Sequence, residues 1–551
     1  MRPNSFNDSC SLPQIGVDMC LPYSCRNEDL TEYFRSIIGV NNDLSPVCRV
    51  VNVNQRLPPT STGTWVLLPI ISFLVLTSIV AGSMDYMGKF EKSRGFGWKV
   101  LCSFSLYRNI KEIFNIENLN KPGQISSINC IRTISTIWVI LGHCASILLL
   151  VCTNPLDFMD FGKTYTGLIL SNAFFAVDTF FFISAFLLSF LWFKSVQKHR
   201  STVLSTSGWI MFYVHRITRI SPVYYITILF YTFIYTRFVS DMPIFMSPMF
   251  QDDTCAQNYW LNLLYINNIV DTKNICYVVS WYLATDFQLY ILSPLILLPF
   301  AISGPILGII VSSILFLLST LFNAYQIYFW YFPPTDYAFG PKHPKYDADQ
   351  HRYETWNYYN PLIRCQIYIM GLVLGYFMQK IPKMNINAWL DRAMWILSLG
   401  SMVFVIMVIQ NNIDGNLWPP FQAAMYSCLS RPLWGLSLSW ILLSTYYRPS
   451  LINDFMSLPF WTPIARLSFS TYLIHIMVAG YFFGKNHSEL YFHSLPYFFM
   501  DTVIPVTFIS FILSIFWSSI FELPFAKIIA MLLNPPKTPK MVEKKIAPEH
   551  F

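Results

Sequence analysis

Charged residues are scarce in this sequence of 551 residues. Asp, Glu, Lys and Arg make up 12% of the chain, whereas 54% of its residues are hydrophobic and 17% are aromatic. Soluble domains carry about 25% charged residues, so the composition predicts an all-α polytopic membrane protein instead. The net charge of +7 is then a matter of membrane orientation, and nucleic acid is not an expected partner.

Several motifs of soluble enzymes are also missing. The chain has no P-loop, no G-x-S-x-G elbow, no H-E-x-x-H and no C-x-x-C. No ATP site and no metal site is therefore predicted. We interpret Cys130, Cys144, Cys152, Cys365 and Cys428 as apolar packing residues of helices and not as ligands or nucleophiles.

The first 64 residues differ from the rest of the chain because they are polar and contain four cysteines, Cys10, Cys20, Cys25 and Cys48. An even number of cysteines in a short, core-poor segment predicts two disulfides in an oxidising compartment, with the pairing left open. No secretory hydrophobic region precedes them. Either the first membrane helix exports this segment or the chain lacks its true beginning, and we favour the second explanation.

Long apolar runs recur after this segment and predict eleven membrane spans. Their approximate limits are 65–82, 130–152, 172–193, 222–239, 281–301, 304–329, 361–379, 392–410, 431–447, 464–484 and 501–523.

Lys and Arg residues suggest the orientation of these spans. With residues 1–64 outside, the cytosolic segments 83–129 and 524–551 carry 7 and 5 such residues, whereas no outer loop between spans carries more than 3. The bias predicts an outer N-terminus and a cytosolic C-terminus. We expect a multi-pass protein of the plasma membrane or endoplasmic reticulum, whose basic loop 83–126 contacts anionic lipid and whose basic tail 526–551 is disordered.

A pair of cysteines and the glycosylation sequons agree with that orientation. Cys255 and Cys276 fall in one predicted outer loop, where a disulfide can form. The N-x-S/T sequons, Asn7 and Asn486, also fall outside.

The run NCIRTISTIWVILGHC holds two residues that a bilayer disfavours, Arg132 and His143. Eleven residues separate them, so both lie on one face of a helix, about 16 Å apart along its axis. An ionisable group at that depth is costly and usually faces a polar cavity. A histidine that donates to the carbonyl of a neighbouring helix is the structural alternative.

Three more ionisable groups lie at a similar depth in the outer half of other spans: Asp178, Asp286 and His475. Each alone is more simply structural, but four groups at one level favour a shared polar cavity. We predict that these four are catalytic, since a histidine oriented by Asp178 or Asp286 can deprotonate a hydroxyl.

Arginines near the cytosolic side suggest a complementary site. Arg216 and Arg219 are three residues apart on one helical face, and together with Arg132 they form a candidate phosphate site. Contact with lipid headgroups is the alternative for the pair. Arg364, at the outer end of its span, could contact an acceptor or extend to the interface.

These residues carry a family resemblance. Arg132 and His143 in IRTISTIWVILGH match the R-x10-H signature of the acyltransferase-3 membrane proteins, and Arg216 and Arg219 match its RxxR signature. Further blocks resemble the family in order: VDTFFFISAFLL, WYLATDFQLY, NPLIRCQIYIMGLVLGY and LSFSTYLIH. DMCLPYSCRNEDL is similar to the outer domain of the animal branch called nose-resistant-to-fluoxetine-like. The chain departs from the pattern at Asn129, Cys130 and Ala185.

The resemblance implies a ten-helix acyltransferase domain, 127–525, preceded by an outer cysteine-bearing segment, 1–64, and one extra helix, 65–82. It also implies transfer of an acyl group from cytosolic acyl-CoA, as donor substrate, to a hydroxyl-bearing or lipid acceptor. His143 is then the base, and Arg132, Arg216 and Arg219 handle the donor.

Two other functions remain open on the sequence. A transporter or a lipid- and xenobiotic-handling protein can use the same polar cavity without acyl chemistry. A receptor-like scaffold that acts through residues 1–64 is the third hypothesis.

Overall fold

The computed structural model describes residue 33 and residues 61–89, 95–117, 125–239, 254–335, 341–346, 350–485 and 490–533. Within this part of the chain the protein is helical, without strands, and with one isolated bridge between Cys152 and Leu490. The four N-terminal cysteines, both sequons and the tail after residue 533 lie outside the described residues. The predictions made for them stay predictions.

Ten helices in the described part of the chain are long and apolar enough to cross a membrane, which confirms the all-α polytopic membrane fold. Five are single helices: α2 (Thr62–Tyr86), α5 (Ser127–Val151), α8 (Phe174–Val203), α15 (Pro305–Trp330) and α22 (Trp461–Gly484). The other five are composite: α9 to α10 (Thr206–Val239), η5 to α14 (Val278–Ile302), η6 with α17 (Glu354–Lys380), α18 with α19 (Ala388–Ile413) and α23 to α25 (Leu495–Leu533).

The predicted span 431–447 is the one that differs from these ten. It forms the second half of α20 (Pro420–Tyr447), a helix that is long enough but not among the ten apolar ones. Arg431 and several serines dilute its apolar character, and the helix packs against α15, α17 and α18. Contact with protein on several sides explains why a polar helix is tolerated at this depth.

Helix starts follow local capping chemistry. Pro361 occupies the first turn of α17 (Pro361–Lys380), where its missing N–H costs nothing, and the Leu362 N–H donates to Asn360 Oδ1 at 2.9 Å. Farther along the chain, α25 (Leu523–Leu533) is helical, which corrects the prediction that the disordered tail begins at residue 526.

The closest helix pair is formed by α8 and α17. A Cβ added at Gly371 would lie 2.5 Å from the Phe182 carbonyl oxygen, and one at Gly375 would lie 2.5 Å from that of Phe186. Small residues four apart let two backbones approach inside a membrane. Ala185 lies opposite Gly371, so this pair of helices tolerates its methyl group.

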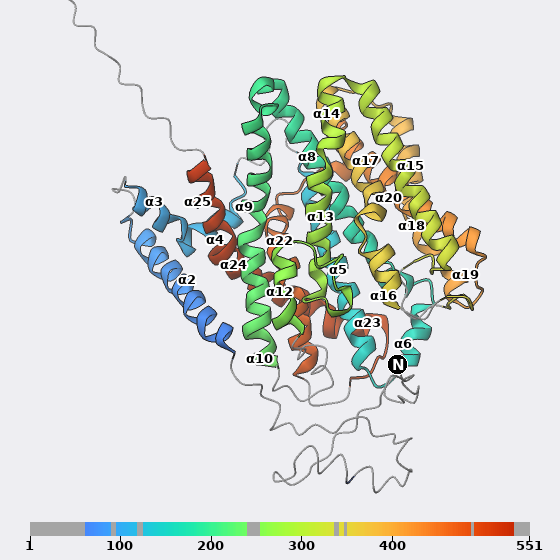
Figure 1. Ribbon diagram of the computed structural model, residues 1–551, viewed down its shortest axis with the longest axis horizontal. Helices are drawn as coiled ribbons and strands as arrows, with labels where there is room; N and C mark the ends of the chain where they lie inside the picture. Colours follow the sequence, from blue (N-terminus) through green and yellow to red (C-terminus); the bar gives the residue numbers. More distant parts are fainter. Residues whose placement is uncertain are drawn as a thin grey trace, which may run out of the picture.

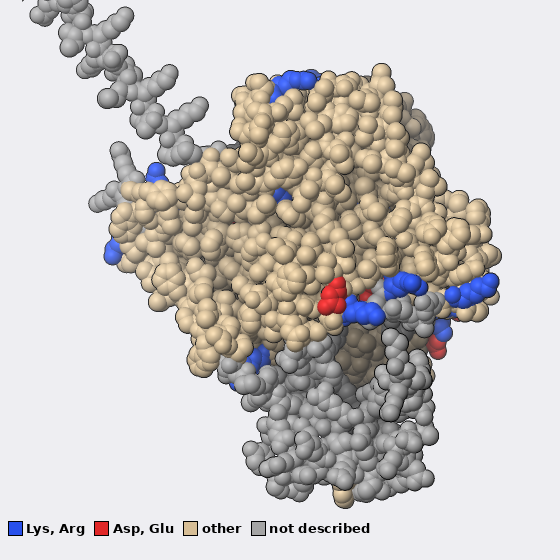
Figure 2. Space-filling model, in the orientation of Figure 1, with Lys and Arg blue, Asp and Glu red and all other residues tan. Residues whose placement is uncertain are grey.

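Figure 1 shows a bundle of steeply inclined helices with α2 beside it, at the opposite edge from α18 and α19. α2 contacts α3 (Phe96–Ser103) and α4 (Leu106–Phe114), and most of its surface is exposed. Figure 2 shows that one face of the molecule is almost free of charge between its two ends, as an apolar membrane belt requires.

The disulfide expected in the loop after α10 is present. Cys255 of α12 (Thr254–Leu263) is bonded to Cys276, which confirms that prediction. α12 lies at the same end of the bundle as α6 (Pro155–Gly162) and α23 (Leu495–Phe498), and we call this end the predicted outer end (Figure 1).

Candidate active site

The two membrane-embedded histidines meet. α5 carries His143 and packs along α22, which carries His475. His143 Nδ1 lies 2.8 Å from His475 Nε2, and the ring centroids are 5.0 Å apart. His475 is fully buried and His143 is partly exposed. The sequence placed both residues at one depth, and the structure makes them a hydrogen-bonded pair.

The hydrogen bonds of this pair assign the tautomers. His475 Nδ1 lies 2.7 Å from the carbonyl oxygen of Tyr472, which can only accept, so Nδ1 carries the proton. In the neutral ring, His475 Nε2 is then an acceptor, and His143 Nδ1 must donate to it. This leaves His143 Nε2 unprotonated and without a partner among the described residues. The backbone of α22 thus fixes which nitrogen of His143 can act as a base.

A pocket of about 280 Å³ reaches His143. It lies between α5, α8 and η6 (Glu354–Tyr358), and residues of α6 line its far side. It is therefore on the side of His143 that faces the predicted outer end. Its lining does not include Arg132, Arg216 or Arg219.

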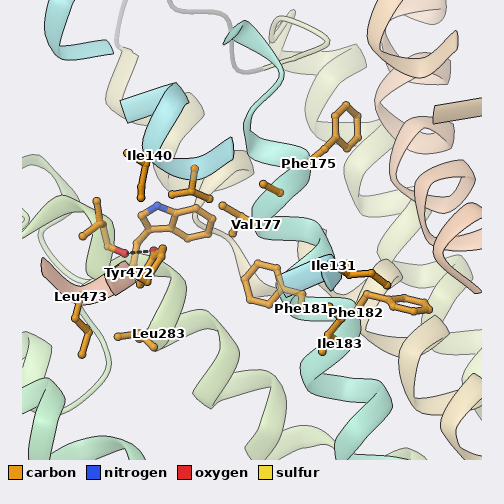
Figure 3. Close-up of a cluster of buried hydrophobic side chains, with 14 of the residues drawn as sticks. Ile131, Ile140, Phe175, Val177, Phe181, Phe182, Ile183, Leu283, Tyr472 and Leu473 are labelled. Atoms are coloured by element: carbon orange, nitrogen blue, oxygen red, sulfur yellow. Dashed lines mark hydrogen bonds between the residues drawn. The ribbon is translucent and has the colours of Figure 1, made fainter. Parts of the chain in front are cut away.

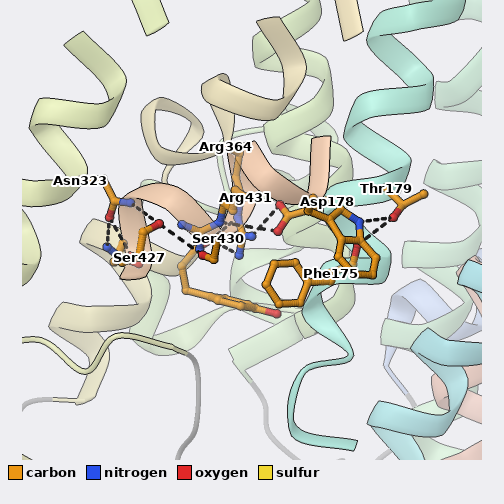
Figure 4. Close-up of polar contacts among 11 residues, drawn as sticks. Phe175, Asp178, Thr179, Asn323, Arg364, Ser427, Ser430 and Arg431 are labelled. Carbon is orange, nitrogen blue, oxygen red and sulfur yellow. Dashed lines mark hydrogen bonds and ion pairs between the residues drawn. The ribbon is translucent and has the colours of Figure 1, made fainter. Parts of the chain in front are cut away.

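Asp178 does not contact the histidine pair. Its Oδ1 accepts from Arg364 Nη1 at 2.8 Å, and its Oδ2 lies 3.5 Å from Arg431 Nε. Figure 4 shows both guanidinium groups pointing at this carboxylate. Asp178 and Arg364 are fully buried. The prediction that Asp178 orients His143 is thus corrected. Arg364 does not extend to the membrane interface, which was one of the two alternatives for it.

Asp178 and His143 do not meet because their helices, α8 and α5, present them in different directions. α8 turns Asp178 towards α17 and α20, whereas His143 faces α22. Depth can be counted along a sequence, but the direction in which each helix presents a side chain depends on how the helices pack.

Asp286 does not contact the histidine pair either. It forms an ion pair with Arg216, which also donates to Ser184 Oγ at 3.2 Å. Tyr290 stacks under the same guanidinium, whose carbon lies 4.9 Å from the ring centroid. The prediction that Asp286 assists His143 is corrected, and Arg216 is not a free phosphate ligand because its charge is already paired.

Arg132, Arg216 and Arg219 nevertheless come together, close enough for their charges to interact. Arg132 is partly exposed, and its guanidinium has no hydrogen-bond or ion-pair partner among the described residues. Arg219 is exposed. We call these three residues the inner arginine cluster.

Glu522 belongs to this region and was missed in the sequence. It ends the π-helical turn η8 (Ser518–Glu522), and its Oε2 accepts from Ser470 at 2.6 Å and from Ser518 at 2.9 Å. Its charge interacts with that of Arg219. A carboxylate inside an apolar span and a π-turn both point to functional regions, so the segment SSIFELPF contained a usable signal.

An aromatic layer separates the inner arginine cluster from the histidine pair. Tyr282 interacts electrostatically with Arg132, and its ring lies 4.8 Å from Phe181 and 5.4 Å from Tyr472. The Tyr472 ring lies 5.6 Å from His475. Figure 3 shows Phe181 and Tyr472 among apolar side chains that include Ile140 and Val177. We call Phe181, Tyr282 and Tyr472 the aromatic layer.

Metal ligation has no candidate in the described part of the chain, where no group of three His, Cys, Asp or Glu side chains could hold an ion. The geometry offers an imidazole with a free nitrogen at a pocket, and the unpaired guanidinium of Arg132 on the other side of the aromatic layer.

Comparison with known proteins identifies the family. The acyltransferase-3 family model, described as an acyltransferase domain, matches residues 125–523. The chain belongs to the acyltransferase-3 family. It is also 25% identical over 568 residues to Nose resistant to fluoxetine protein 6 of Caenorhabditis elegans, a match that covers 95% of this chain and 67% of that protein. No solved structure matches the chain.

Membership in the acyltransferase-3 family implies acyl transfer in general terms. The departures from its motifs are accommodated in the structure. Asn129 donates from Nδ2 to Thr462 Oγ1 at 3.2 Å, and Cys130 is buried beside it. Both residues lie near the start of α5, and the Asn129 hydrogen bond ties this helix to α22, which supplies His475.

Proposed function

We propose that this protein is an integral-membrane O-acyltransferase that moves an acyl group from acyl-CoA to a hydroxyl acceptor, with His143 as the general base. The observation that carries the proposal is the hydrogen bond from His143 Nδ1 to His475, which leaves His143 Nε2 as the free basic atom at the pocket.

The proposed reaction balances at His143. Nε2 takes the proton of the acceptor hydroxyl while the oxygen forms a bond to the thioester carbonyl carbon, and the carbon–sulfur bond breaks. The proton then passes from Nε2 to the departing thiolate. The products are an ester and CoA with a free thiol, and the base is regenerated.

His475 acts as a positioning residue in this proposal. Its Nε2 accepts from His143 Nδ1, so it holds the ring in the productive tautomer and stabilises the imidazolium that forms. Most histidine bases use a carboxylate for this purpose. A neutral imidazole is a weaker partner, but it avoids a buried negative charge in the hydrocarbon layer.

The donor is proposed to bind from the arginine side. Arg132 has an unpaired guanidinium there, and the nearby Arg219 adds positive charge, whereas Arg216 is already paired with Asp286. Arg132 and His143 are about 16 Å apart along α5, with the aromatic layer between them. An acyl-CoA whose phosphates bind Arg132 can bring its thioester to His143 only if side chains of that layer move aside.

The test uses full-length protein in lipid nanodiscs, supplied with acetyl-CoA or palmitoyl-CoA and a mixture of 1-hexanol, glycerol and glucose. Release of the CoA thiol and formation of an acylated product are measured together. We expect His143→Gln to lower both by roughly 10²- to 10⁴-fold, the usual contribution of a general base. His493→Gln is the matched control because His493 is exposed and lies outside the pocket.

Two further results decide the proposal. His475→Gln keeps an amide oxygen that can accept from His143, so it should retain more activity than His475→Leu and should shift the pH profile. Equal turnover in wild type and His143→Gln would overturn the role of His143. No acyl product with wild type, together with substrate uptake into sealed proteoliposomes that depends on His143, would instead support the transport alternative.

A further inference from the structure

The pocket at His143 is small and lies on one side of the catalytic nitrogen. Its volume is about 280 Å³, just below the range of roughly 300–1,000 Å³ that is typical of drug-sized ligand sites. The pocket therefore fits a compact molecule, or one end of a longer one.

Apolar side chains make most of its wall. They come from α5, α6, α7 (Leu168–Ser171) and α8 and include Val139, Leu149, Phe158, Leu170, Phe174 and Val177. Such a wall favours apolar ligands at about 25 cal/mol per Å² of apolar surface removed from water.

The serine hydroxyl protons of the lining are already donated to backbone carbonyls, so these side chains remain only as acceptors. Ser146 Oγ donates to the Gly142 carbonyl oxygen at 3.0 Å, and Ser171 Oγ donates to that of Gly167 at 3.4 Å. Glu354 is the one charged residue of the lining. A ligand with many hydroxyls would lose its water here and would find few fixed partners, at a cost of roughly 1–3 kcal/mol for each unsatisfied group.

We propose that the pocket binds compact, mainly apolar alcohols that carry a single hydroxyl, and that it rejects sugars and other polyols. This inference rests on the acyltransferase function proposed above, since it places the one hydroxyl of the ligand at His143 Nε2. The apolar body then fills the space between α5, α6 and α8.

Photo-crosslinking tests binding without any acyl transfer. Full-length protein in nanodiscs is exposed to a diazirine derivative of hexanol or to a diazirine derivative of glucose, and the labelled peptides are mapped by mass spectrometry. We expect the hexanol probe to label α5, α6 or α8 at the pocket and 1-hexanol to compete with it. We expect the glucose probe to leave these helices unlabelled.

A matched pair of variants links the label to the pocket. Ser146 is exposed at the pocket and Leu150 is exposed one turn further along α5, outside the lining. A tryptophan can be placed at either position without disturbing the core. Ser146→Trp should fill part of the pocket and reduce labelling about tenfold or more. The loss of one methylene-sized contact in an apolar pocket already weakens binding by about that factor. Leu150→Trp should leave labelling unchanged.

A third variant tests selectivity by enlarging the pocket. Phe174→Ala removes a ring from the wall. We expect cyclohexylmethanol to compete better with the hexanol probe in Phe174→Ala than in wild type. Melting temperatures of all three variants show whether the fold is intact. If a variant fails to fold, competition between 1-hexanol and the hexanol probe on the wild type decides the test instead.

The same samples separate this inference from the proposed function. Labelling by the hexanol probe without release of the CoA thiol would support the pocket assignment and overturn the acyltransferase proposal. Esterification of glucose or glycerol in preference to 1-hexanol would support acyl transfer and overturn the acceptor class. Equal labelling by both probes, or labelling unaffected by Ser146→Trp, would also overturn the acceptor class.

Discussion

Two arginines inside the bundle, Arg364 and Arg132, differ in how completely their charge is paired. Arg364 is fully buried, donates to Asp178 and, from Nε and Nη2, donates to the Tyr358 carbonyl oxygen at 3.2 Å. Arg132, in the inner arginine cluster, is partly exposed and has no such partner among the described residues. Arg364 therefore connects helices, whereas Arg132 is open to an anion.

This difference shows that an arginine at membrane depth is not by itself a binding site. A buried guanidinium whose donors are satisfied connects helices, here α8 and α17. The unpaired guanidinium of Arg132, with Arg219 nearby, raises the local positive potential and favours an anionic ligand. Four predictions test the comparison, from the largest expected effect to the smallest.

Asp178→Asn should have the largest effect, and it should be on stability. It leaves Arg364 and Arg431 buried without a counter-charge, and breaking a buried pair costs about 3–5 kcal/mol. We expect a large fall in the thermal midpoint in detergent and in the yield of folded protein. Asp160→Asn is the control, because Asp160 pairs with Lys163 at the exposed surface. An unchanged midpoint for Asp178→Asn would show that the connection is dispensable.

Arg132→Gln should act on donor binding and leave the fold intact. Hydrogen bonds to a charged group contribute about 1.5–3 kcal/mol, which corresponds to a rise in the KM for acyl-CoA of roughly 10- to 150-fold. Arg392→Gln, at an exposed arginine that lies over Trp389, is the control. A loss of stability in Arg132→Gln comparable to that of Asp178→Asn would mean that Arg132, like Arg364, holds the fold together.

Arg431→Met should cost less than Arg364→Met. Two guanidinium groups share the one carboxylate of Asp178, and Arg431 Nε and Nη1 have no hydrogen-bond acceptor in the described part of the chain. Replacing it removes unsatisfied donors, so we expect a change within about 1 kcal/mol, against about 3–5 kcal/mol for Arg364→Met. Chemical denaturation of the two variants side by side checks this order, and the reverse order contradicts it.

Arg219→Gln should have the smallest effect. Arg219 is exposed, and exposed charge interactions are worth about 0–1 kcal/mol. The KM for acyl-CoA should therefore rise less than about fivefold, and the rise should diminish at high salt. An effect as large as that of Arg132→Gln would mean that Arg219 holds the donor directly.

The sequence predicted the depth of the polar residues well and their partners poorly. His143 and His475 could be placed at one level by counting residues from the ends of their spans, and the structure joins them. The same counting grouped Asp178 and Asp286 with them, although packing turns each one to a different helix. Span 431–447 shows a related limit, because a helix enclosed by other helices need not be apolar along its length.

The sequence by itself determined the membrane fold, the approximate spans, the family signatures and the cysteines that pair after α10, because these depend on apolar run lengths and local spacing. The tertiary structure alone decided which histidine nitrogen is free, which carboxylates are occupied by arginine, and where the pocket lies. These depend on how each helix is rotated about its axis and on which side chains of distant segments meet, and hydropathy along a single chain does not encode either.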